Sequence, residues 1–347
     1  MALPIKLDFP PMDALLQNEI PVGSEWQYEP KWDGFRCLAF RDRGDVQLQS
    51  KSGQSLTRYF PELVEALMEL KASMFVLDSE IVIPTGPEAN NLSFADLLMR
   101  IHPAESRVRK LSKSSPAMLA VFDLLVDDKG KLLADKPLSQ RRKQLEAFAR
   151  KYLKRNPGIK LSTATSDITT AKQWFGMAGT GLDGIIAKRL DLPYRSGDRS
   201  GMVKVKKQMT ADCVVGGFRY GTHSKIAGSL LLGLYNEQGL LDHVGFTSAL
   251  SSAERTALTP KLEKLIKAPG FTGAAPGGPS RWSSERSADW KPLDPKLVVE
   301  VRYDHFTGGR FRHGTKLLRW RPDKAPRQCT QAQVESESRF APGEFLV

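Results

Sequence analysis

Short apolar runs alternate with polar residues along the first two hundred positions, which predicts strands interspersed with helices. FRCLAF and VQLQS flank the polar turn RDRGD, a pattern typical of a β-hairpin. In MFVLDSEIVI, Phe75, Leu77 and Ile81 alternate with Asp78 and Glu80, as expected of a strand with one buried face. AMLAVFDLLV is apolar except for one acid, which favours a strand covered on both faces.

Two segments show helical spacing. PELVEALMEL begins with a proline suited to a first helical turn, and Leu63, Leu67 and Leu70 fall on one side. SQRRKQLEAFARKYLKR has an apolar stripe and a strongly basic remainder, which includes Arg141 and Arg142. We interpret that remainder as a solvated face, or as a surface that follows a phosphate backbone.

The pattern changes near residue 209. DCVVGGF, SLLLGLY, LLDHVGF, LVVEVRY and TKLLRW are short strand-like runs, with one helix-like insert, SAERTALTPKLEKLIK, and a Gly/Pro/Ser-rich loop at 269–289. Five strands with one helix favour a small closed OB-type barrel over an immunoglobulin-like sandwich. The chain is therefore predicted to be α+β, with one domain at 1–209 and an OB-fold domain at 210–347.

Composition limits the class of protein. The 347 residues exceed the usual size of one compact domain, which also predicts two domains. The 51 Lys and Arg residues exceed the 39 acidic ones, giving a formal charge of +12. Such a surplus suits a polyanionic partner, although general solubility would also explain it.

The sequence contains neither an apolar stretch long enough to span a bilayer nor a signal-peptide layout at its start, so a cytoplasmic, nucleoid-associated protein is expected. Cys37, Cys213 and Cys329 are far apart and form no C-x-x-C pair. We interpret them as packing residues, not as disulfide or zinc ligands.

The stretch YEPKWDGFR raises a question of chemistry at Lys31. Pro30 biases Glu29 toward an extended backbone, so a strand end or loop is expected, and Asp33 and Gly34 permit a sharp turn. A lysine with its reference pKa of about 10.4 is protonated at pH 7 and is not a nucleophile. Burial and neighbouring cations would lower that pKa, whereas the alternative is a surface lysine beside a hairpin.

Four further features bear on that choice. Glu80 lies mid-strand and needs a donor or cation unless it faces solvent at an edge. Phe122 is either a core residue or a surface on which a base stacks. Asp183 precedes a strand-like run, and Lys204 and Lys206 lie at strand period, able to bind one anion.

Together these residues resemble the covalent nucleotidyltransferases, and within them the ATP-dependent DNA ligases. The signature K-x-D-G-x-R is KWDGFR, and SKSGQSLTRYFPEL, LDSEI, AVFDLL, GLDGIIAKR, MVKVKK and LRWRPDKAP follow in order. The resemblance covers about residues 22–328. It is nearest to small bacterial and mycobacterial stand-alone ligases of the ligase C type, and to the ligase part of end-joining enzymes. It implies an ATP-grasp-like nucleotidyltransferase domain followed by the OB barrel.

The resemblance also implies residue roles. Lys31 would attack the α-phosphorus of ATP, release pyrophosphate and carry AMP as a phosphoramidate. Glu29 would read the adenine edge and Phe122 would stack on its face, while Arg36 and Glu80 would hold the ribose.

A second group of residues would contact the phosphates and the metal. Asp183 and Glu80 would hold Mg²⁺ or Mn²⁺, and Lys204 and Lys206 would neutralise the α-phosphate. Lys51 would contact phosphate where the family usually has arginine, and Met202 stands where a tryptophan is common. The residues expected to orient pyrophosphate as the barrel closes are Arg321, Asp323 and Lys324.

The implied substrate is nicked double-stranded DNA, sealed in repair or recombination by a monomer, with a repair polymerase or primase-polymerase as an expected partner. Only 30 residues precede Lys31, too few for the helical DNA-binding domain of larger ligases or for a nicotinamide-recognising domain. ATP is therefore favoured over NAD. The alternatives are an RNA ligase, an mRNA-capping guanylyltransferase, or a non-catalytic OB-fold protein that binds nucleic acid.

Overall fold

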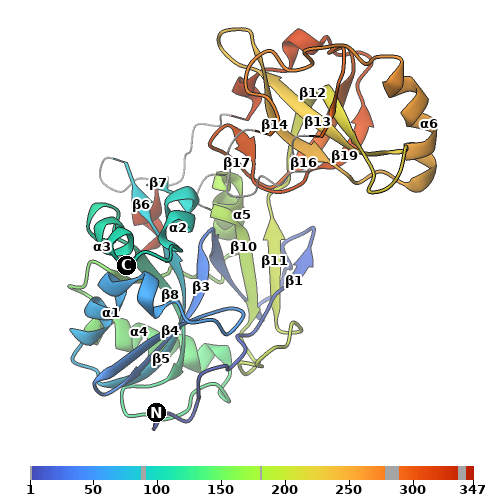
Figure 1. Ribbon diagram of the computed structural model, residues 1–347. Coiled ribbons are helices and arrows are strands. Elements are labelled where there is room, and N and C mark those ends of the chain that lie inside the picture. Colours follow the sequence, from blue (N-terminus) through green and yellow to red (C-terminus); the bar gives the residue numbers. More distant parts are fainter. Residues whose placement is uncertain (1, 87–90, 180–181, 278–288, 335–340) are drawn as a thin grey trace. The chain divides into compact units, whose positions relative to one another are not determined.

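The computed structural model describes residues 2–86, 91–179, 182–277, 289–334 and 341–347. The chain forms two compact units (Figure 1). Unit 1 comprises Met1–Lys207 with Ser338–Val347, and unit 2 comprises Gln208–Glu337. The boundary between the units, at Lys207 and Gln208, lies close to residue 209, where the pattern of apolar and polar residues changes.

The larger sheet of unit 1 has the order β4-β3-β5-β8-β9. Its strands are β3 (Phe35–Asp42), β4 (Asp45–Ser50), β5 (Met74–Val82), β8 (Met118–Val126) and β9 (Ile159–Leu161), and only the β8–β9 pair is parallel. Leu77, Leu119 and Val121 on one face pack with Leu63 and Leu145 of two helices. The hairpin and the two apolar strands predicted from sequence are confirmed.

Those helices are α1 (Pro61–Met68) and α4 (Leu138–Tyr152), and both were predicted. The interpretation of α4 was wrong in one respect, because Arg141 and Arg142 are buried and do not belong to a solvated face. Arg141 donates to both carboxylate oxygens of Asp123 at 2.9 Å, and Arg142 donates to Glu146. A buried guanidinium needs such a partner, and the sequence did not reveal the distant one.

The second sheet of unit 1 has the order β1-β11-β10-β2. Its strands are β1 (Leu15–Gln17), β2 (Trp26–Trp32), β10 (Leu182–Arg189) and β11 (Met202–Lys206). One face is apolar and packs beside α5 (Ile168–Met177) through Tyr28, Ile185, Ala187, Val203 and Val205. Because side chains alternate along a strand, the intervening residues occupy the opposite face.

Smaller elements complete unit 1. They are α2 (Phe94–Arg100), α3 (Glu105–Ser114), η1 (Thr57–Tyr59) and a short hairpin of β6 (Pro84–Thr85) and β7 (Asn91–Leu92). Residues 341–347 also belong to unit 1: the N–H of Leu161 donates to Val347, and the Phe345 ring packs edge-on against Trp32 and Trp174. The sequence-based division placed residues 341–347 in the second domain. They belong to the first because Phe345 is buried against that unit.

The larger sheet of unit 2 has the order β14-β13-β12-β16-β19, and β15 (Lys291–Pro292) also pairs with β12. The long strands are β12 (Met209–Tyr220), β13 (Ala227–Tyr235), β14 (Leu241–Thr247), β16 (Val298–Tyr303) and β19 (Lys316–Trp320). β17 (Phe306–Thr307) pairs with β18 (Arg310–Phe311), and α6 (Ser252–Glu263) starts at a capping box on Ser251. All five predicted strands and the inserted helix are confirmed.

The fold of unit 2 is OB-like. A single bridge between Thr247 and Thr315 links the end of β14 to the start of β19. No ladder joins these two strands among the residues that the structure describes, so the closed barrel stays a prediction. Part of the predicted loop at 269–289, residues 278–288, lies outside the described residues.

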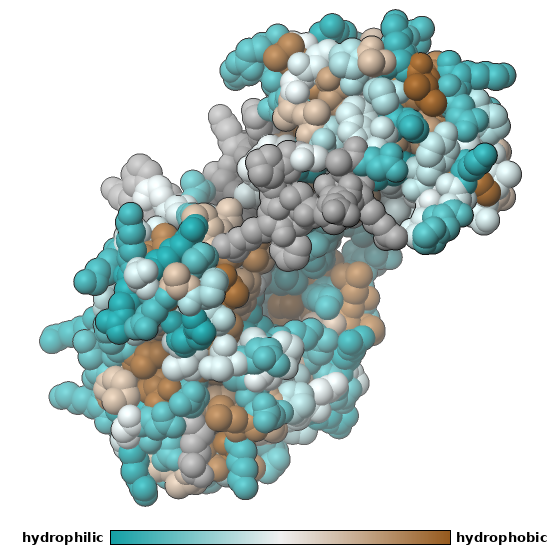
Figure 2. Space-filling model, in the orientation of Figure 1, coloured by the Kyte–Doolittle hydropathy of each residue, from teal (hydrophilic) through white to brown (hydrophobic). Residues whose placement is uncertain are grey.

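Two simpler predictions can be compared with the structure. The three cysteines are free and fully buried, which confirms their packing role. Within the described ranges, no helix is long and apolar enough to cross a membrane. Figure 2 shows hydrophilic residues over much of the visible surface of each unit.

Candidate active site

Strand register brings three of the four predicted lysines of unit 1, Lys31, Lys204 and Lys206, onto one sheet face. Gly184 in β10 pairs with Lys31 of β2 on one side and with Lys206 of β11 on the other. Two residues along, Ile186 pairs with Glu29 and Lys204. The resulting rows, Lys31–Gly184–Lys206 and Glu29–Ile186–Lys204, lie opposite the apolar face, as period-two alternation requires.

Asp183 joins this face through a β-bulge. The register between β10 and β2 shifts between Leu182 and Gly184, so Asp183 is the additional residue. Its Oδ2 lies 2.5 Å from Nζ of Lys31 and 3.6 Å from Nζ of Lys206. Bulges commonly re-aim a side chain beside an active site. Here the bulge directs a carboxylate between two ammonium groups.

The ion pair corrects the expected ionisation of Lys31. Burial alone would lower the pKa of Lys31, but attraction and a hydrogen bond from Asp183, with Glu80 and Asp33 nearby, raise that pKa above its ordinary value. The prediction that neighbouring cations would depress it was therefore wrong for this structure. The nearest charged group is an anion.

The expected effect of clustered cations appears instead at Lys204. Burial lowers the pKa of Lys204, and the positive charges of Lys51, Lys31 and Lys206 lower it further, against an opposing effect of Asp13. A region with this surplus of positive charge attracts polyanions. The phosphate-binding role predicted for these lysines is consistent with that electrostatic arrangement.

Glu29 is buried and has two partners. Its Oε2 lies 2.6 Å from Nζ of Lys188, and its Oε1 accepts a 2.8 Å hydrogen bond from Gln27. Lys188 also lies over the Phe122 ring, 4.5 Å from the centroid. The sequence motif contains Lys188, but sequence reasoning gave this residue no role. Its contacts place it beside both residues predicted to recognise adenine.

The larger sheet supplies the other wall. Arg36 of β3 pairs in register with Glu80 of β5, and its guanidinium binds the fully buried Asp78. Tyr194 donates its hydroxyl to Asp78 at 2.6 Å and accepts the N–H of Met12 at 2.9 Å. Sequence reasoning gave Asp78 and Tyr194 no place in the site. Alternation in LDSEI placed Asp78 beside Glu80 but did not identify its partners.

Phe122 lies at a second bulge. The register between β5 and β8 shifts at this point, because Ser79 pairs with Val121 whereas Asp78 pairs with Asp123. The guanidinium carbon of Arg36 lies 4.7 Å from the centroid of the Phe122 ring. The Lys188 ammonium described above contacts the same ring. The ring therefore sits between polar groups of both sheets and is not part of the continuous apolar core.

Glu80 has an unusual ionisation. Burial raises the pKa of Glu80 to about 7, with Asp33 and Asp78 adding to the rise and Arg36 and Lys31 opposing it. Gly34 makes the local approach feasible, since a Cβ at this position would overlap the carbonyl oxygen of Ile81 and crowd Glu80. The D-G pair of the signature thus lets the turn after Lys31 lie against β5.

Many of these residues line one pocket of about 160 Å³ in unit 1. Seven predicted site residues contribute to its wall: Glu29, Lys31, Arg36, Lys51, Glu80, Phe122 and Lys204. Asp13, Ile186 and Lys188 line it as well and were not predicted to do so. Asp183 contacts Lys31 of the pocket wall, and Lys206 contacts Asp183, through the ion pairs described above.

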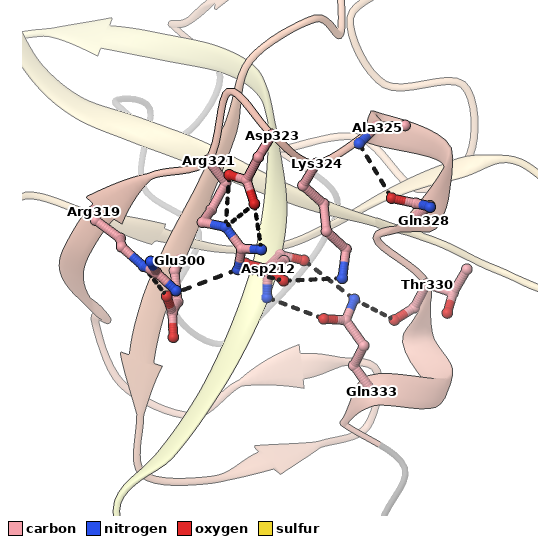
Figure 3. A network of polar contacts seen from close by, with 10 residues as sticks. All are labelled: Asp212, Glu300, Arg319, Arg321, Asp323, Lys324, Ala325, Gln328, Thr330 and Gln333. Carbon is pink, nitrogen blue, oxygen red and sulfur yellow. Dashed lines mark hydrogen bonds and ion pairs between the residues drawn. The ribbon is translucent and has the colours of Figure 1, made fainter.

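The three remaining predicted residues lie in unit 2, where they form a network of their own (Figure 3). Figure 3 shows Arg321 and Lys324 both pointing toward Asp212. Nη1 of Arg321 lies 2.8 Å from Oδ1 of Asp212, and Nζ of Lys324 lies 3.1 Å from Oδ2. Asp323 pairs with the Arg321 guanidinium at 2.8 Å. Sequence reasoning missed Asp212, the first acid of β12, which pairs in register with Glu300.

Comparisons with known proteins identify relatives over nearly the whole chain. Residues 14–206 match the family "ATP dependent DNA ligase domain", and residues 223–324 match "ATP dependent DNA ligase C terminal region". The chain is 43% identical to DNA ligase C2 of Mycolicibacterium smegmatis, covering 97% of both chains. It is 42% identical to DNA ligase C of Mycobacterium tuberculosis, covering 96% of both.

A solved structure agrees at the level of the fold. The structure from a study of Lig E DNA ligases superimposes with a TM-score of 0.51 at 16% identity, covering 89% of this chain and 100% of that one. The comparison thus supports the fold alone.

Proposed function

Because this chain belongs to the ATP-dependent DNA ligase family, we propose that Lys31 is the residue that becomes adenylated. The chain is an ATP-dependent DNA ligase of the ligase C type. The observation that carries the proposal is the placement of the Lys31 ammonium in a pocket that also contains Phe122 and Lys204. An aromatic surface, a nucleophile and phosphate-binding cations therefore share one cavity.

The first step forms one bond and breaks another. Nζ of Lys31, after losing a proton to solvent, attacks the α-phosphorus of ATP. The bond between that phosphorus and the oxygen bridging it to the β-phosphorus breaks, and this oxygen leaves with pyrophosphate. Since Asp183 keeps Lys31 protonated in this structure, the ion pair must be exchanged when ATP binds. The positive charges of Lys204 and Lys206 stabilise the negative charge that builds on the α-phosphate.

Residues on the two sheets of unit 1 are proposed to recognise the nucleoside. Phe122 stacks on adenine, and Glu29, held by Lys188 and Gln27, reads the base edge. Arg36 and Glu80 contact the ribose, with Arg36 oriented by Asp78. Lys51 contacts the phosphates as a point charge, which gives less directional binding than an arginine.

A divalent metal fits the carboxylates around Lys31. Asp183 and Glu80 both act on Lys31 electrostatically, and carboxylate oxygens beside phosphate-binding cations are the hard donors that Mg²⁺ or Mn²⁺ prefers. When bound, the metal supplies charge neutralisation on the phosphates. Asp183 and Glu80 are the proposed ligands.

The later steps seal the nick. An oxygen of the 5′-phosphate attacks the lysyl-bound AMP, which breaks the P–N bond, and the 3′-hydroxyl then attacks the 5′-phosphorus and displaces AMP. Arg321, Asp323 and Lys324 are proposed to contact the leaving pyrophosphate in the first step. A role in DNA repair with a polymerase partner is part of the same proposal.

A nick-sealing assay tests this function. A 5′-labelled nicked duplex is incubated with ATP and Mg²⁺, and denaturing gels resolve the substrate, the DNA-adenylate and the sealed strand. We expect wild-type protein to seal the nick and Lys31→Ala to leave it open unless the nick is adenylated beforehand. Sealing of the ordinary nick by Lys31→Ala would refute the proposal.

A further inference from the structure

Asp13 stands at the rim of the nucleotide pocket and is held by the backbone around it. Its N–H donates to the carbonyl of Asp198 at 2.9 Å, and the preceding N–H, from Met12, donates to Tyr194. Just after Asp13, Leu15 pairs with Val203 at the start of β1. Because these anchors flank Asp13, the backbone that carries its carboxylate is held in place and is not a free segment.

The Asp13 carboxylate contacts cations from two segments. Its Oδ2 lies 2.9 Å from Nζ of Lys51 and 3.4 Å from Nε of Arg199. Burial raises the pKa of Asp13, but hydrogen bonds from Lys51 and Ala14 and the charges of Lys51 and Lys204 lower it overall. Asp13 is therefore an anion at neutral pH, located among groups suited to phosphate.

These contacts can be exchanged for contacts to another anion. The side chains of Lys51 and Arg199 are 57% and 67% exposed, so their ion pairs with Asp13 are hydrated and screened. A phosphate group offers more charge and more acceptor oxygens than one carboxylate. A phosphate that approaches Lys51 must therefore compete with Asp13 for the same ammonium group.

We propose that Asp13 is an internal competitor for phosphate, whose carboxylate occupies Lys51 and Arg199 and thereby weakens the binding of phosphate ligands at this rim. The proposal rests on the proposed function of the pocket. The ligand is a phosphate, supplied either by the triphosphate of ATP or by the 5′-phosphate at a nick. Unlike the other charged residues of the pocket wall, Asp13 would limit affinity and not increase it.

The test removes the charge and keeps the shape. Asp13→Asn should bind ATP or nicked DNA about threefold more tightly, because the competing charge is lost. One arm titrates ATP by calorimetry without divalent metal, so that no chemistry is needed. The other arm charges the enzyme with AMP, removes ATP and measures AMP transfer against the concentration of nicked duplex. Tighter binding in the first arm identifies the triphosphate, and in the second the nick phosphate.

Two further variants make the result specific. Asp128→Asn is a matched control, because the side chain of Asp128 is 22% exposed and that of Asp13 is 18% exposed. Asp128 pairs with Lys151, and neither residue lines the pocket. It should change neither arm. Asp13→Asn combined with Lys51→Ala should lose the gain. Unchanged or weaker binding in both arms for Asp13→Asn would overturn the proposal, whereas failure of wild type to take up AMP would count against the assignment of Lys31 instead.

Discussion

The guanidinium of Arg36 binds both carboxylate oxygens of Asp78, with Nε 2.6 Å from Oδ1 and Nη2 2.6 Å from Oδ2. Asp78 is fully buried, and Tyr194 donates a third hydrogen bond to it. The arrangement connects β3, β5 and the segment before β11. It fixes the side chain proposed to hold the ribose.

Loss of the Asp78 charge should destabilise the fold and weaken nucleotide binding. Asp78→Asn leaves a guanidinium half-satisfied in a buried site, so we expect a loss of about 3 kcal/mol in the free energy of unfolding. The KM for ATP should rise because Arg36 is no longer oriented. Urea unfolding and AMP-labelling kinetics measure the two effects. Asp128→Asn, which alters a more exposed pair, should cost about 1 kcal/mol or less; equal losses would contradict the role given to Asp78.

Replacement of Phe122 should affect adenine binding. Phe122→Leu keeps an apolar side chain but removes the flat ring, so the KM for ATP should rise about tenfold, equivalent to about 1.4 kcal/mol of stacking. Phe122→Tyr keeps the ring and should stay close to wild type. Steady-state AMP labelling over a range of ATP concentrations provides the comparison. A KM that is the same for Leu and wild type would exclude stacking on this ring.

The glycine of the signature can be tested against another glycine of the same unit. At Gly34 a Cβ would overlap the backbone of Ile81, whereas at Gly44 a Cβ would meet no atom within 4 Å. Gly34→Ala should therefore lower stability by about 2 kcal/mol and slow AMP labelling, because the turn after Lys31 must move. Gly44→Ala should change both by little. Thermal unfolding and labelling rates of the two variants measure the difference.

Stability should depend on pH through His243 in unit 2. Burial lowers the pKa of His243 to about 3, with the charges of Arg310 and Arg219 adding to the effect. The unfolded chain, with a pKa near 6.5, binds the proton more readily, so stability is full above that value and falls as pH drops toward 3. Titration of His243 should therefore lower the free energy of unfolding by about 2 kcal/mol between pH 7 and pH 5.

The His243 effect is isolated by comparing each protein with itself. Urea unfolding of wild type and His243→Asn at pH 7 and pH 5 gives two pH differences, from which the cost of the substitution itself cancels. We expect the fall to be smaller in the variant by about 2 kcal/mol. Identical falls would mean that His243 does not carry the titration.

The sequence predicted the elements well because the signals are local. Period-two alternation in LDSEI and KVKK correctly placed Glu80, Lys204 and Lys206 on strands. The same alternation predicted that Lys204 and Lys206 share a face, and the pairing with Ile186 and Gly184 shows that they do. The five strands of unit 2 follow from the same kind of pattern.

The sequence could not predict contacts that depend on distant pairing. Tyr194 meets Asp78 across 116 positions, and no spacing rule connects them. The bulge that directs Asp183 toward Lys31 is a property of two paired strands and has no signature in either one. The pKa of Lys31 was wrongly predicted for the same reason, because counting nearby lysines does not reveal which charge is closest.

The central claim is tested most directly by mapping the adenylated residue. Protein incubated with ATP and Mg²⁺ is quenched, digested without exposure to acid and analysed by tandem mass spectrometry, alongside Lys31→Arg. We predict one added adenylyl group, located on Lys31 in wild type and absent from the variant. An adenylyl group on any other lysine, or its persistence in Lys31→Arg, would contradict the account.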